Sequence, residues 1–417
     1  MISEATPSLT PDRAALDMLA TVLARAVGTG TLTMTDPWEG RHVFGSGAAP
    51  FVSVRLIDPQ TSVRILADPM LGVGEAYMDG TLIIEEGSLR DFLMIGVTVS
   101  SEITRLAQAF QGTVTPLHMA QRHNPIARSR ANVAHHYDLS EDLYRLFLDA
   151  DMQYSCAYFE SGDESLEVAQ AKKKRHIAAK MRLTPGARVL DIGCGWGGMA
   201  LELARLHNVD VDGLTLSTEQ LRVATARADT DDLDRTAHFH LRDYREETGT
   251  YDRIVSVGMF EHVGAPHFAE FFEVVCRLLA PDGLAVIHAI GRRDSPGEHD
   301  AWIDKYIFPG GYCPSLSEVF AAVEPSGLWV TDMEILTLHY AETLRCWSER
   351  FQAQRAVAAQ LYDERFCRMW EFYLASCEAG FRAGPLMVFQ IQLARTVAAT
   401  PQTRDYMVDE ERRLSLP

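Results

Sequence analysis

The spacing of apolar residues divides the chain into parts with different periods. Residues 12–27 repeat apolar side chains at the spacing of one helix face, through Ala15, Met18, Leu19 and Leu23. Three strand-like stretches, separated by Gly, Pro and Asp, follow at residues 30–34, 52–56 and 62–66. This mixture predicts a small α+β domain over residues 1–116.

A second pattern begins near residue 140. Ser140, followed by the acidic residues Glu141 and Asp142, predicts the start of a helix. Apolar strand-like runs then recur at residues 188–192, 209–216, 238–241, 253–257 and 284–290. Helical spacing lies between them at residues 199–206, 219–228 and 267–279. This alternation predicts a parallel sheet within residues 136–417, with a ligand crevice at the carboxyl ends of the strands.

The two patterns are separated by a polar and basic stretch. Residues 117–135 contain Pro125 and have no clear apolar period, so we expect them to form a linker. A chain of 417 residues also exceeds what one hydrophobic core usually organises, which favours two domains.

The strand at residues 188–192 runs into a glycine-rich loop. Gly193, Gly195 and Gly197 have the spacing GxGxG, whereas dinucleotide sites use GxGxxG. Glycine permits a tight turn and lets a ligand approach the backbone. Asp191 precedes the first glycine; it would repel a pyrophosphate but suits the amino group and sulfonium of S-adenosylmethionine. The loop therefore favours S-adenosylmethionine over NAD, although glycines alone also fit a plain strand-to-helix turn.

Polar residues also follow the next two strands. Thr215 and Gln220 lie where nucleotide sites often place groups for the ribose hydroxyls. Ser217 followed by Gln220 is at the same time a capping box for the next helix, and the two roles are compatible. After the third strand, Asp243 is suited to accept a hydrogen bond from an adenine amino group, the plain alternative being an exposed acid at a strand end.

Composition narrows the class of protein. Hydrophobic residues make up 47% and charged residues 23%, as in globular proteins, and the formal net charge of −18 disfavours nucleic-acid binding. No apolar run reaches the length of a membrane span, and the N-terminus is unlike a signal peptide, so we expect a cytoplasmic protein. Seven cysteines without a CxxC pair fit reduced thiols, and no metal site is predicted.

Basic residues are nevertheless clustered locally. Lys172, Lys173, Lys174 and Arg175 follow one another. Such runs are usually solvated helix faces, and contact with a membrane surface is the alternative interpretation.

Several segments together resemble one family, the cyclopropane fatty acid synthases and the related mycolic acid cyclopropane synthases. The resemblance covers about residues 120–395 and includes the glycine loop with its Trp196. The other matching segments are 134–139 (AHHYDL), 152–159 (MQYSCAYF), 255–264 (VSVGMFEHVG), 287–291 (IHAIG), 305–310 (KYIFPG) and 339–344 (HYAETL).

The resemblance implies a Rossmann-like class I S-adenosylmethionine methyltransferase domain behind a smaller, lipid-associated N-terminal domain. It implies contacts with S-adenosylmethionine for Tyr154, Ser155, Gly193, Gly195, Thr215 and Gln220. It further implies a buried bicarbonate held by Cys156, Glu261, His288, Tyr340 and the backbone of Ile290. The implied substrate is an unsaturated phospholipid, which would bring the enzyme into peripheral contact with the inner membrane surface. A homodimer would be the commonest assembly.

Adding a methylene group to an alkene requires a dry apolar slot and a base for the proton lost as the ring closes. Glu261, His288 and Tyr340 are suited to acid–base work, and the implied bicarbonate would take the proton. Singly, the residues have plainer explanations: Glu261 as a helix cap, His288 as a core histidine and Cys156 as an inert thiol. Together, at strand ends of one sheet, they favour catalysis.

Three other functions share parts of this pattern. A related lipid methyltransferase would give a methyl-branched or methylene product, and its motifs would be much the same. A small-molecule N-methyltransferase is disfavoured by the full bicarbonate set. A lipid-binding protein without catalysis is disfavoured by the intact cofactor loop.

Overall fold

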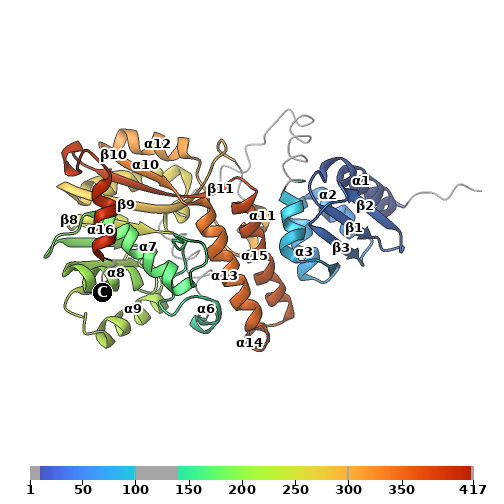
Figure 1. Ribbon diagram of the computed structural model, residues 1–417, viewed down its shortest axis with the longest axis horizontal. Coiled ribbons are helices and arrows are strands. Elements are labelled where there is room, and N and C mark those ends of the chain that lie inside the picture. Colours follow the sequence, from blue (N-terminus) through green and yellow to red (C-terminus); the bar gives the residue numbers. More distant parts are fainter. Residues whose placement is uncertain (1–9, 98, 100–139, 298–299, 415–417) are drawn as a thin grey trace, which may run out of the picture. The chain divides into compact units, whose positions relative to one another are not determined.

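The computed structural model describes residues 10–97, 99, 140–297 and 300–414 (Figure 1). It divides into two compact units. The first comprises Met1–Thr115, Asp300–Tyr306 and Arg355–Gly384, and the second comprises Pro116–His299, Ile307–Gln354 and Pro385–Pro417. The linker expected at residues 117–135 lies outside the described residues. The domain limits drawn from the sequence stay a prediction, and the first unit also takes in two segments from the C-terminal part.

The first unit contains a four-stranded sheet with the order β2-β1-β3-β4. Strand β1 (Thr31–Thr35) pairs antiparallel with β2 (Arg41–Gly45) and parallel with β3 (Phe51–Leu56), which pairs antiparallel with β4 (Leu82–Glu86). The helices of this unit include α1 (Pro11–Ala26), α2 (Thr61–Ala67), α3 (Pro69–Met78), α11 (Ala301–Tyr306), α14 (Arg355–Leu361) and α15 (Glu364–Arg382). The helix and the first two strands expected from the apolar pattern are confirmed, as is the α+β character of this part.

The strand expected at residues 62–66 is wrong, because this stretch lies inside helix α2. The buried side chains of α2 are Thr61, Ser62 and Ile65, which is the spacing of a helix face, whereas Val63 is exposed. Packing of α2 against α3 therefore outweighs the weak strand preference of its β-branched residues.

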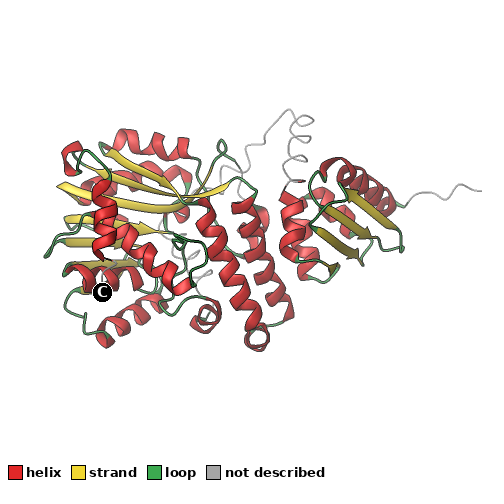
Figure 2. Ribbon diagram, viewed as in Figure 1, coloured by secondary structure: helices red, strands yellow, loops and turns green. Residues whose placement is uncertain are grey.

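The second unit is built on a β-sheet with helices packed against it (Figure 2). The sheet has seven strands in the order β10-β11-β9-β8-β5-β6-β7. Its strands are β5 (Arg188–Ile192), β6 (Asp210–Thr215), β7 (Ala237–Leu241), β8 (Tyr251–Val257), β9 (Leu279–Arg292), β10 (Trp329–Ile335) and β11 (Leu386–Ala394). Strands β5 to β9 pair in parallel, which confirms the βαβ prediction. Strand β11 pairs antiparallel with both β9 and β10, so the complete sheet is mixed.

Helices cover this sheet on both faces. The α-helices of the second unit are α6 (Glu141–Phe147), α7 (Leu166–Met181), α8 (Gly198–His207), α9 (Thr218–Thr230), α10 (Phe268–Leu278), α12 (Leu316–Val323), α13 (Thr337–Ala353) and α16 (Asp405–Leu414). Ser140 caps α6, and its Oγ accepts a hydrogen bond from Leu143 N at 3.4 Å, as the sequence predicted.

Alternate residues of the strands enter two different cores. On β9, Ile287 and Ala289 join a cluster with α10 and α12, whereas Val286 joins a cluster with α7, α8 and α16. On β11, Phe389 and Ile391 belong to the first of these clusters. Because successive side chains of a strand point to opposite faces, the even-numbered residues of β9 and β11 face the α7 side of the sheet.

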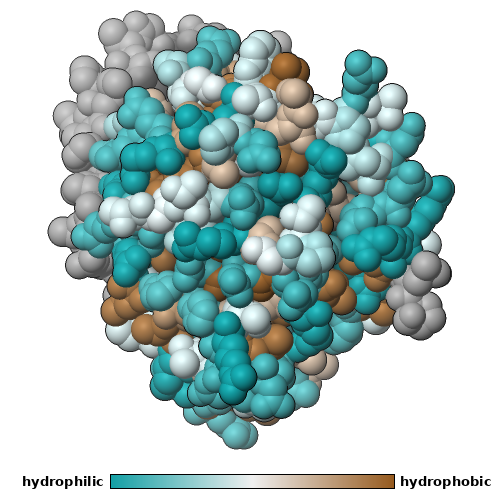
Figure 3. Space-filling view, turned by 90° about the vertical axis from the view of Figure 1, so that its left-hand side faces the viewer, coloured by the Kyte–Doolittle hydropathy of each residue, from teal (hydrophilic) through white to brown (hydrophobic). Residues whose placement is uncertain are grey.

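On the face shown in Figure 3, hydrophilic side chains predominate and apolar ones are scattered among them. Among the helices that the structure describes, none combines the length and the hydropathy needed to span a bilayer.

Candidate active site

A cavity lies at the carboxyl ends of β5, β6, β7 and β8, where the sequence placed the ligand crevice. Its wall includes every residue expected to contact the cofactor except Gly197: Tyr154, Ser155, Asp191, Gly193, Gly195, Thr215, Gln220 and Asp243. Gly197 precedes the first residue of α8, and a Cβ atom there would lie 2.9 Å from Cβ of Ala224. The absence of a side chain at Gly197 therefore lets the start of α8 pack closely against α9.

The glycine loop is held against the neighbouring strand. The backbone N–H groups of Gly193 and Cys194 both donate to Leu214 O at 2.9 Å. Gly195 has φ +54°, and a Cβ atom built on it would meet no heavy atom within 4 Å. Because Gly195 also lines the cavity, its missing side chain leaves room for a ligand.

Asp191 is the charged group of this wall that best fits a cationic ligand. It is buried, and its Oδ2 has no hydrogen-bond partner within the described part of the chain. Burial raises the pKa of Asp191 to about 7, although the positive charge of Lys173 opposes this shift. A buried carboxylate oxygen that lines a cavity fits the amino group of S-adenosylmethionine.

Affinity for S-adenosylmethionine should therefore rise with pH. With a pKa of about 7, raising the pH from 6 to 7 increases the ionised fraction of Asp191, and we expect affinity to rise about fivefold. Isothermal calorimetry at both pH values measures this change. In Asp191→Asn the rise should disappear; an unchanged pH dependence in that variant would show that another group controls it.

Thr215 and Gln220 form one polar pair in the cavity wall. Thr215 Oγ1 donates to Gln220 Oε1 at 2.8 Å, while Ser217 Oγ accepts from Gln220 N at 3.2 Å. Ser217 is thus the N-cap of α9, as predicted, but the expected capping box is not formed, because Ser217 N donates to Thr215 Oγ1 at 3.1 Å and not to Gln220. The Gln220 side chain contacts Thr215, so its main visible role is in the cavity wall.

Asp243 also lines the cavity but is already engaged by a neighbouring side chain. Arg245 donates to it twice, from Nε at 2.8 Å and from Nη2 at 2.7 Å. Asp243 is buried, which excludes the exposed-acid alternative. A carboxylate accepts about four hydrogen bonds, so a contact with adenine stays a prediction.

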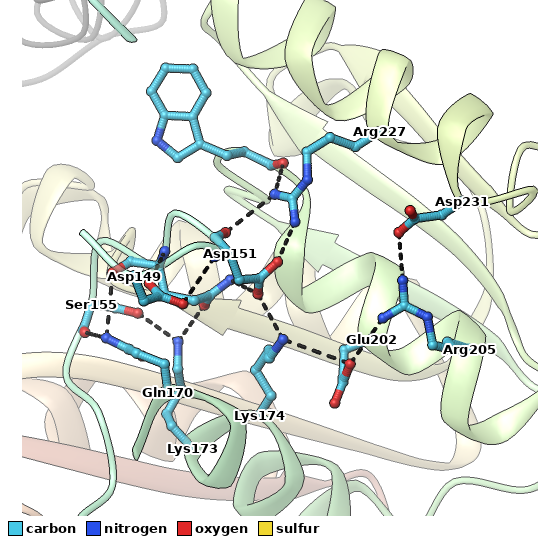
Figure 4. Close-up of polar contacts among 12 residues, drawn as sticks. Asp149, Asp151, Ser155, Gln170, Lys173, Lys174, Glu202, Arg205, Arg227 and Asp231 are labelled. Carbon is cyan, nitrogen blue, oxygen red and sulfur yellow. Dashed lines mark hydrogen bonds and ion pairs between the residues drawn. The ribbon is translucent and has the colours of Figure 1, made fainter. Parts of the chain in front are cut away.

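The wall segment that contains Tyr154 and Ser155 is held from behind by helix α7 (Figure 4). Lys173 Nζ donates to Gln153 Oε1 at 2.5 Å and to Ser155 Oγ at 2.8 Å, and Gln170 Nε2 donates to Ser155 O at 2.9 Å. An ammonium group can only donate, so Ser155 Oγ accepts and its own proton is available to a ligand.

The structure corrects both interpretations of the lysine cluster. The side chain of Lys173 is 1% exposed, and Lys174 is also buried, so neither belongs to a solvated face or a membrane contact. Burial and the charge of Lys174 lower the pKa of Lys173 to about 8. Lys172 lies nearer the surface and pairs with Glu160 and Glu164.

Asp151 links the same segment to the glycine loop (Figure 4). Its carboxylate pairs with Arg227 on α9 and, at 2.7 Å, with Lys174. Arg227 Nη1 also donates to the carbonyl oxygen of Trp196 at 2.8 Å. These bonds position two separate parts of the cavity wall relative to each other.

Lys173→Met should weaken S-adenosylmethionine binding about tenfold, since the variant removes the cation that orients Gln153 and Ser155 and leaves buried oxygens unpaired. Calorimetry at pH 7 measures the affinity. Lys172→Met is the matched control on the same helix and should bind normally, because its pairs lie nearer the surface. Equal affinities for the two variants would remove Lys173 from the cofactor site.

The residues implied to hold bicarbonate lie next to this cavity and are not part of its described wall. Glu261 is in a short 3-10 helix after β8, between the wall residues Met259 and His262. Its Oε1 accepts from Ile290 N at 2.5 Å, and its Oε2 has no partner among the described residues. Burial raises the pKa of Glu261 to about 7, although the Ile290 N–H bond opposes this. Its side chain thus reaches β9 and is not a helix cap.

His288 lies two residues before Ile290, on the α7 side of β9. It is buried, and its Nδ1 is 3.0 Å from Gln390 Nε2 on β11. Burial, reinforced by the positive charges of Lys173 and Lys180, holds the pKa of His288 well below its usual value. At neutral pH the imidazole is therefore uncharged.

Cys156 and Tyr340 lie on segments that are hydrogen-bonded to each other. The residue after Cys156 donates from its backbone N–H to Thr343 Oγ1 at 3.0 Å, and Thr343 lies on α13 with Tyr340. Burial raises the pKa of the Cys156 thiol, which fits the interpretation as an inert thiol. Tyr340 packs edge-on against Trp347, with ring centroids 5.9 Å apart.

Comparison with known proteins decides the family. The model of the mycolic acid cyclopropane synthetase family matches residues 125–391. The chain belongs to this family. It is 40% identical to the cyclopropane-fatty-acyl-phospholipid synthase of Escherichia coli K12 over 354 residues, which cover 84% of this chain and 90% of that protein. It is 35% identical to a probable fatty acid methyltransferase of Pseudomonas putida over 382 residues, 89% of this chain and 94% of that one.

A solved structure of the family matches about two-thirds of the chain. The mycolic acid cyclopropane synthase CmaA1, complexed with S-adenosylhomocysteine and CTAB, has 36% identity and a TM-score of 0.61, and covers 65% of this chain and 99% of its own. The resemblance found in the sequence is thereby confirmed, together with the Rossmann-like fold. This member of the family is an S-adenosylmethionine-dependent methyltransferase.

Sequence reasoning missed the polar layer that supports the site. Lys173 and Lys180 on α7 and Gln390 on β11 are buried, although none was singled out as a site residue. One signal was present: Gln390 and Gln392 interrupt an otherwise apolar strand at a spacing of two, which places both on one face.

Proposed function

We propose that this enzyme transfers a methylene group from S-adenosylmethionine to the cis double bond of an unsaturated phospholipid acyl chain and closes a cyclopropane ring. The proposal is carried by one observation, the hydrogen bond from Ile290 N to the buried carboxyl of Glu261 beside the cofactor cavity. A methyl transfer to nitrogen or oxygen does not require a separate group of acid–base residues beside the cofactor. The identity with the Escherichia coli synthase, which extends over most of both chains, supports the lipid substrate.

Each part of the cavity wall would contact a different part of the cofactor. When bound, S-adenosylmethionine supplies an electrophilic methyl group on a sulfonium. Asp191 would bind its amino group, and Ser155, oriented by Lys173, would donate a hydrogen bond. Thr215 and Gln220 would bind the ribose hydroxyls, and Tyr154 completes the wall on the opposite segment.

Ring closure releases one proton of the transferred methyl group, so the site needs a base that does not itself become alkylated. When bound, bicarbonate supplies a small base of this kind. The residues fit an anion: Glu261 has a free buried oxygen in the described structure and a pKa of about 7, so it carries a proton for much of the time. His288 is neutral, so it is suited to donate. The Cys156 thiol also keeps its proton, which it donates to Ala157 O at 3.3 Å and would turn toward the anion.

The roles within this group follow from these protonation states. Glu261 would hold the anion and exchange a proton with it, because its pKa lies near the working pH. His288, Tyr340 and Cys156 would donate hydrogen bonds, and the backbone of Ile290 fixes Glu261 in place. None of these side chains needs to attack the substrate.

We further propose that the enzyme is cytoplasmic, contacts the inner membrane surface peripherally and forms a homodimer. A phospholipid acyl chain is reached only at a membrane, and the first unit would make that contact. Exposed apolar side chains on its strands, Val43, Phe51 and Ile83, support this assignment.

A methyl-branched or methylene product is the second candidate. The same carbocation, left by methyl transfer to the alkene, would give a methylene group if a 1,2-hydride shift preceded loss of a proton from the new methyl group. It would give a saturated methyl branch if a separate reducing partner supplied a hydride. The likeness to a probable fatty acid methyltransferase of Pseudomonas putida favours this alternative.

Incubation with labelled S-adenosylmethionine and vesicles of unsaturated phospholipid distinguishes these products. We expect an acyl chain that has gained one CH₂ and lost its double bond, identified by mass spectrometry and resistance to mild hydrogenation. A chain with two further hydrogens would establish the methyl branch instead. Vesicles of saturated phospholipid are the control, and label transfer to them would contradict the alkene as acceptor.

A further inference from the structure

Three polar side chains form a row across neighbouring strands behind the site. His288 on β9 is directly opposite Gln390 on β11, which is directly opposite Glu334 on β10. Lys180 and His176 of α7 bond to this row: Lys180 bonds to Gln390 and Glu334, and His176 Nε2 lies 2.6 Å from Glu334 Oε2.

The bonds of Lys180 fix the orientation of the Gln390 amide. Lys180 Nζ lies 2.7 Å from Gln390 Oε1, and an ammonium group only donates, so this atom must be the amide oxygen. The amide nitrogen then faces His288 Nδ1 at 3.0 Å and donates to it. A ring nitrogen that accepts carries no proton, so the proton of the neutral imidazole is on Nε2.

We propose that Gln390, oriented by Lys180, is a positioning residue that holds His288 in the neutral form with its proton on Nε2. His288 then acts as a hydrogen-bond donor toward the base and is not itself the base. This inference rests on the proposed function for the identity of that base, but the tautomer itself does not depend on the lipid substrate.

The proton of His288 is on the opposite ring nitrogen from that of a histidine that acts as a general base. In a catalytic triad a carboxylate accepts from Nδ1–H and leaves Nε2 free to take a proton. Here an amide N–H occupies Nδ1, which leaves Nε2 as the donor. Burial and the charges of Lys173, Lys180 and His176 disfavour imidazolium, while Glu334 favours it to a smaller extent. An anion such as the proposed bicarbonate is bound by hydrogen-bond donors, so a proton on Nε2 of His288 suits this role.

The charged residues around Gln390 form pairs of opposite sign, and these pairs extend to the C-terminal helix α16. Burial disfavours the charged form of His176, but its bonds to Glu334 and Glu411 raise its pKa overall. The bond from His176, together with Lys180, keeps the pKa of Glu334 at about 2 despite burial. Lys180 thus has a fixed anionic partner, and its remaining donors can hold Gln390 in one orientation.

Gln390→Glu tests the proposal, because a carboxylate only accepts and forces Nδ1 of His288 to carry a proton. Nuclear magnetic resonance of ¹⁵N-labelled histidine reports the tautomer, with the His288 signals assigned by their loss in His288→Gln. We expect the parent to have its proton on Nε2 and the variant to have a protonated Nδ1. Turnover should fall about 10- to 100-fold, as for other partners that orient a site residue, with KM for S-adenosylmethionine unchanged.

Gln392→Glu is the matched control. Gln392 lies two residues along β11 on the same face, each glutamine is 1% exposed, and Gln392 Nε2 donates to Lys180 O instead of to a histidine. This variant also buries a carboxylate, and at a higher cost, because it faces Lys180 O and the Tyr406 hydroxyl and not the Lys180 ammonium. Its His288 tautomer and its turnover should nevertheless match those of the parent. Gln390→Met, which adds no charge, is the second variant if Gln390→Glu fails to fold, and it should show a mixture of tautomers.

Two results would overturn the proposal. One is a parent His288 that is protonated at Nδ1 at neutral pH; the other is a Gln390 variant with an altered tautomer and full turnover. If the tautomer is as expected but the product is not a cyclopropane, the proposed function fails and the positioning by Gln390 stands.

Discussion

Replacing Glu261 with glutamine should lower turnover on unsaturated phospholipid by about 10²- to 10⁴-fold, the range typical of acid–base groups. Glutamine keeps the size of the side chain and an oxygen that can accept from Ile290 N. It cannot ionise or exchange a proton, whereas Glu261 has a pKa of about 7 because of its burial. Affinity for S-adenosylmethionine should barely change, because Glu261 is not part of the described cavity wall.

Glu318→Gln separates this effect from a structural one. Glu318 belongs to a true capping box at the start of α12, where Ser315 Oγ accepts from Glu318 N and the Glu318 side chain accepts from Ser315 N. Glutamine can keep this reciprocal bond and loses only the negative charge at the helix N-terminus, so the variant should cost about 0.3–1 kcal/mol of stability with turnover retained. Turnover on phospholipid vesicles, cofactor affinity and melting temperature are therefore measured for both variants.

Near-normal turnover of Glu261→Gln would contradict the catalytic role of Glu261. The parent enzyme provides a separate test of the anion, through activity after rigorous removal of bicarbonate and after its return. Activity that is indifferent to bicarbonate would count against the anion as base, even if Glu261 proves essential.

The parallel core of the sheet could be predicted because each of its strands has a local signal. Residues 188–192 form a short apolar run that ends in glycines, and β5 has these same limits. The remaining sheet could not be predicted in this way. Strand β10 lies at an edge, so its side chains are mostly exposed or half-buried and do not form an apolar run. Its pairing with β11 depends on segments far apart in sequence.

The same distinction between local and long-range signals applies to the active site. Asp191 and the glycine loop could be assigned from charge and spacing within a few residues, and the cavity lies where they predicted it. The residues implied to hold bicarbonate were assigned from the family resemblance, because they are far apart in the sequence and come together only in the folded chain. Gln390 and His288 are 102 positions apart, and Lys180 and Gln390 are 210 apart. The run of lysines on α7 was misread for this reason, since burial of a charge depends on partners that a local pattern does not contain.

Gly195→Val should abolish S-adenosylmethionine binding and leave a folded protein. A Cβ atom at this position meets no protein atom within 4 Å, so the side chain fits the fold. It would project into space that the cavity wall leaves for the ligand. The positive φ of +54° adds a conformational cost, roughly 1–2 kcal/mol, because a branched side chain disfavours the left-handed region.

Gly186→Val is the control that isolates the ligand from the backbone. Gly186 has φ +80°, and a Cβ atom added there would also meet no heavy atom within 4 Å, but Gly186 lies outside the described cavity wall. Both variants should lose a similar amount of stability in thermal unfolding, whereas calorimetry should show loss of binding for Gly195→Val alone. Unchanged affinity in Gly195→Val would remove the glycine loop from the cofactor site. Loss of binding in both variants would mean that backbone strain is the cause. The difference between the two variants therefore measures the space that the ligand needs at Gly195, apart from the conformation that the loop needs there.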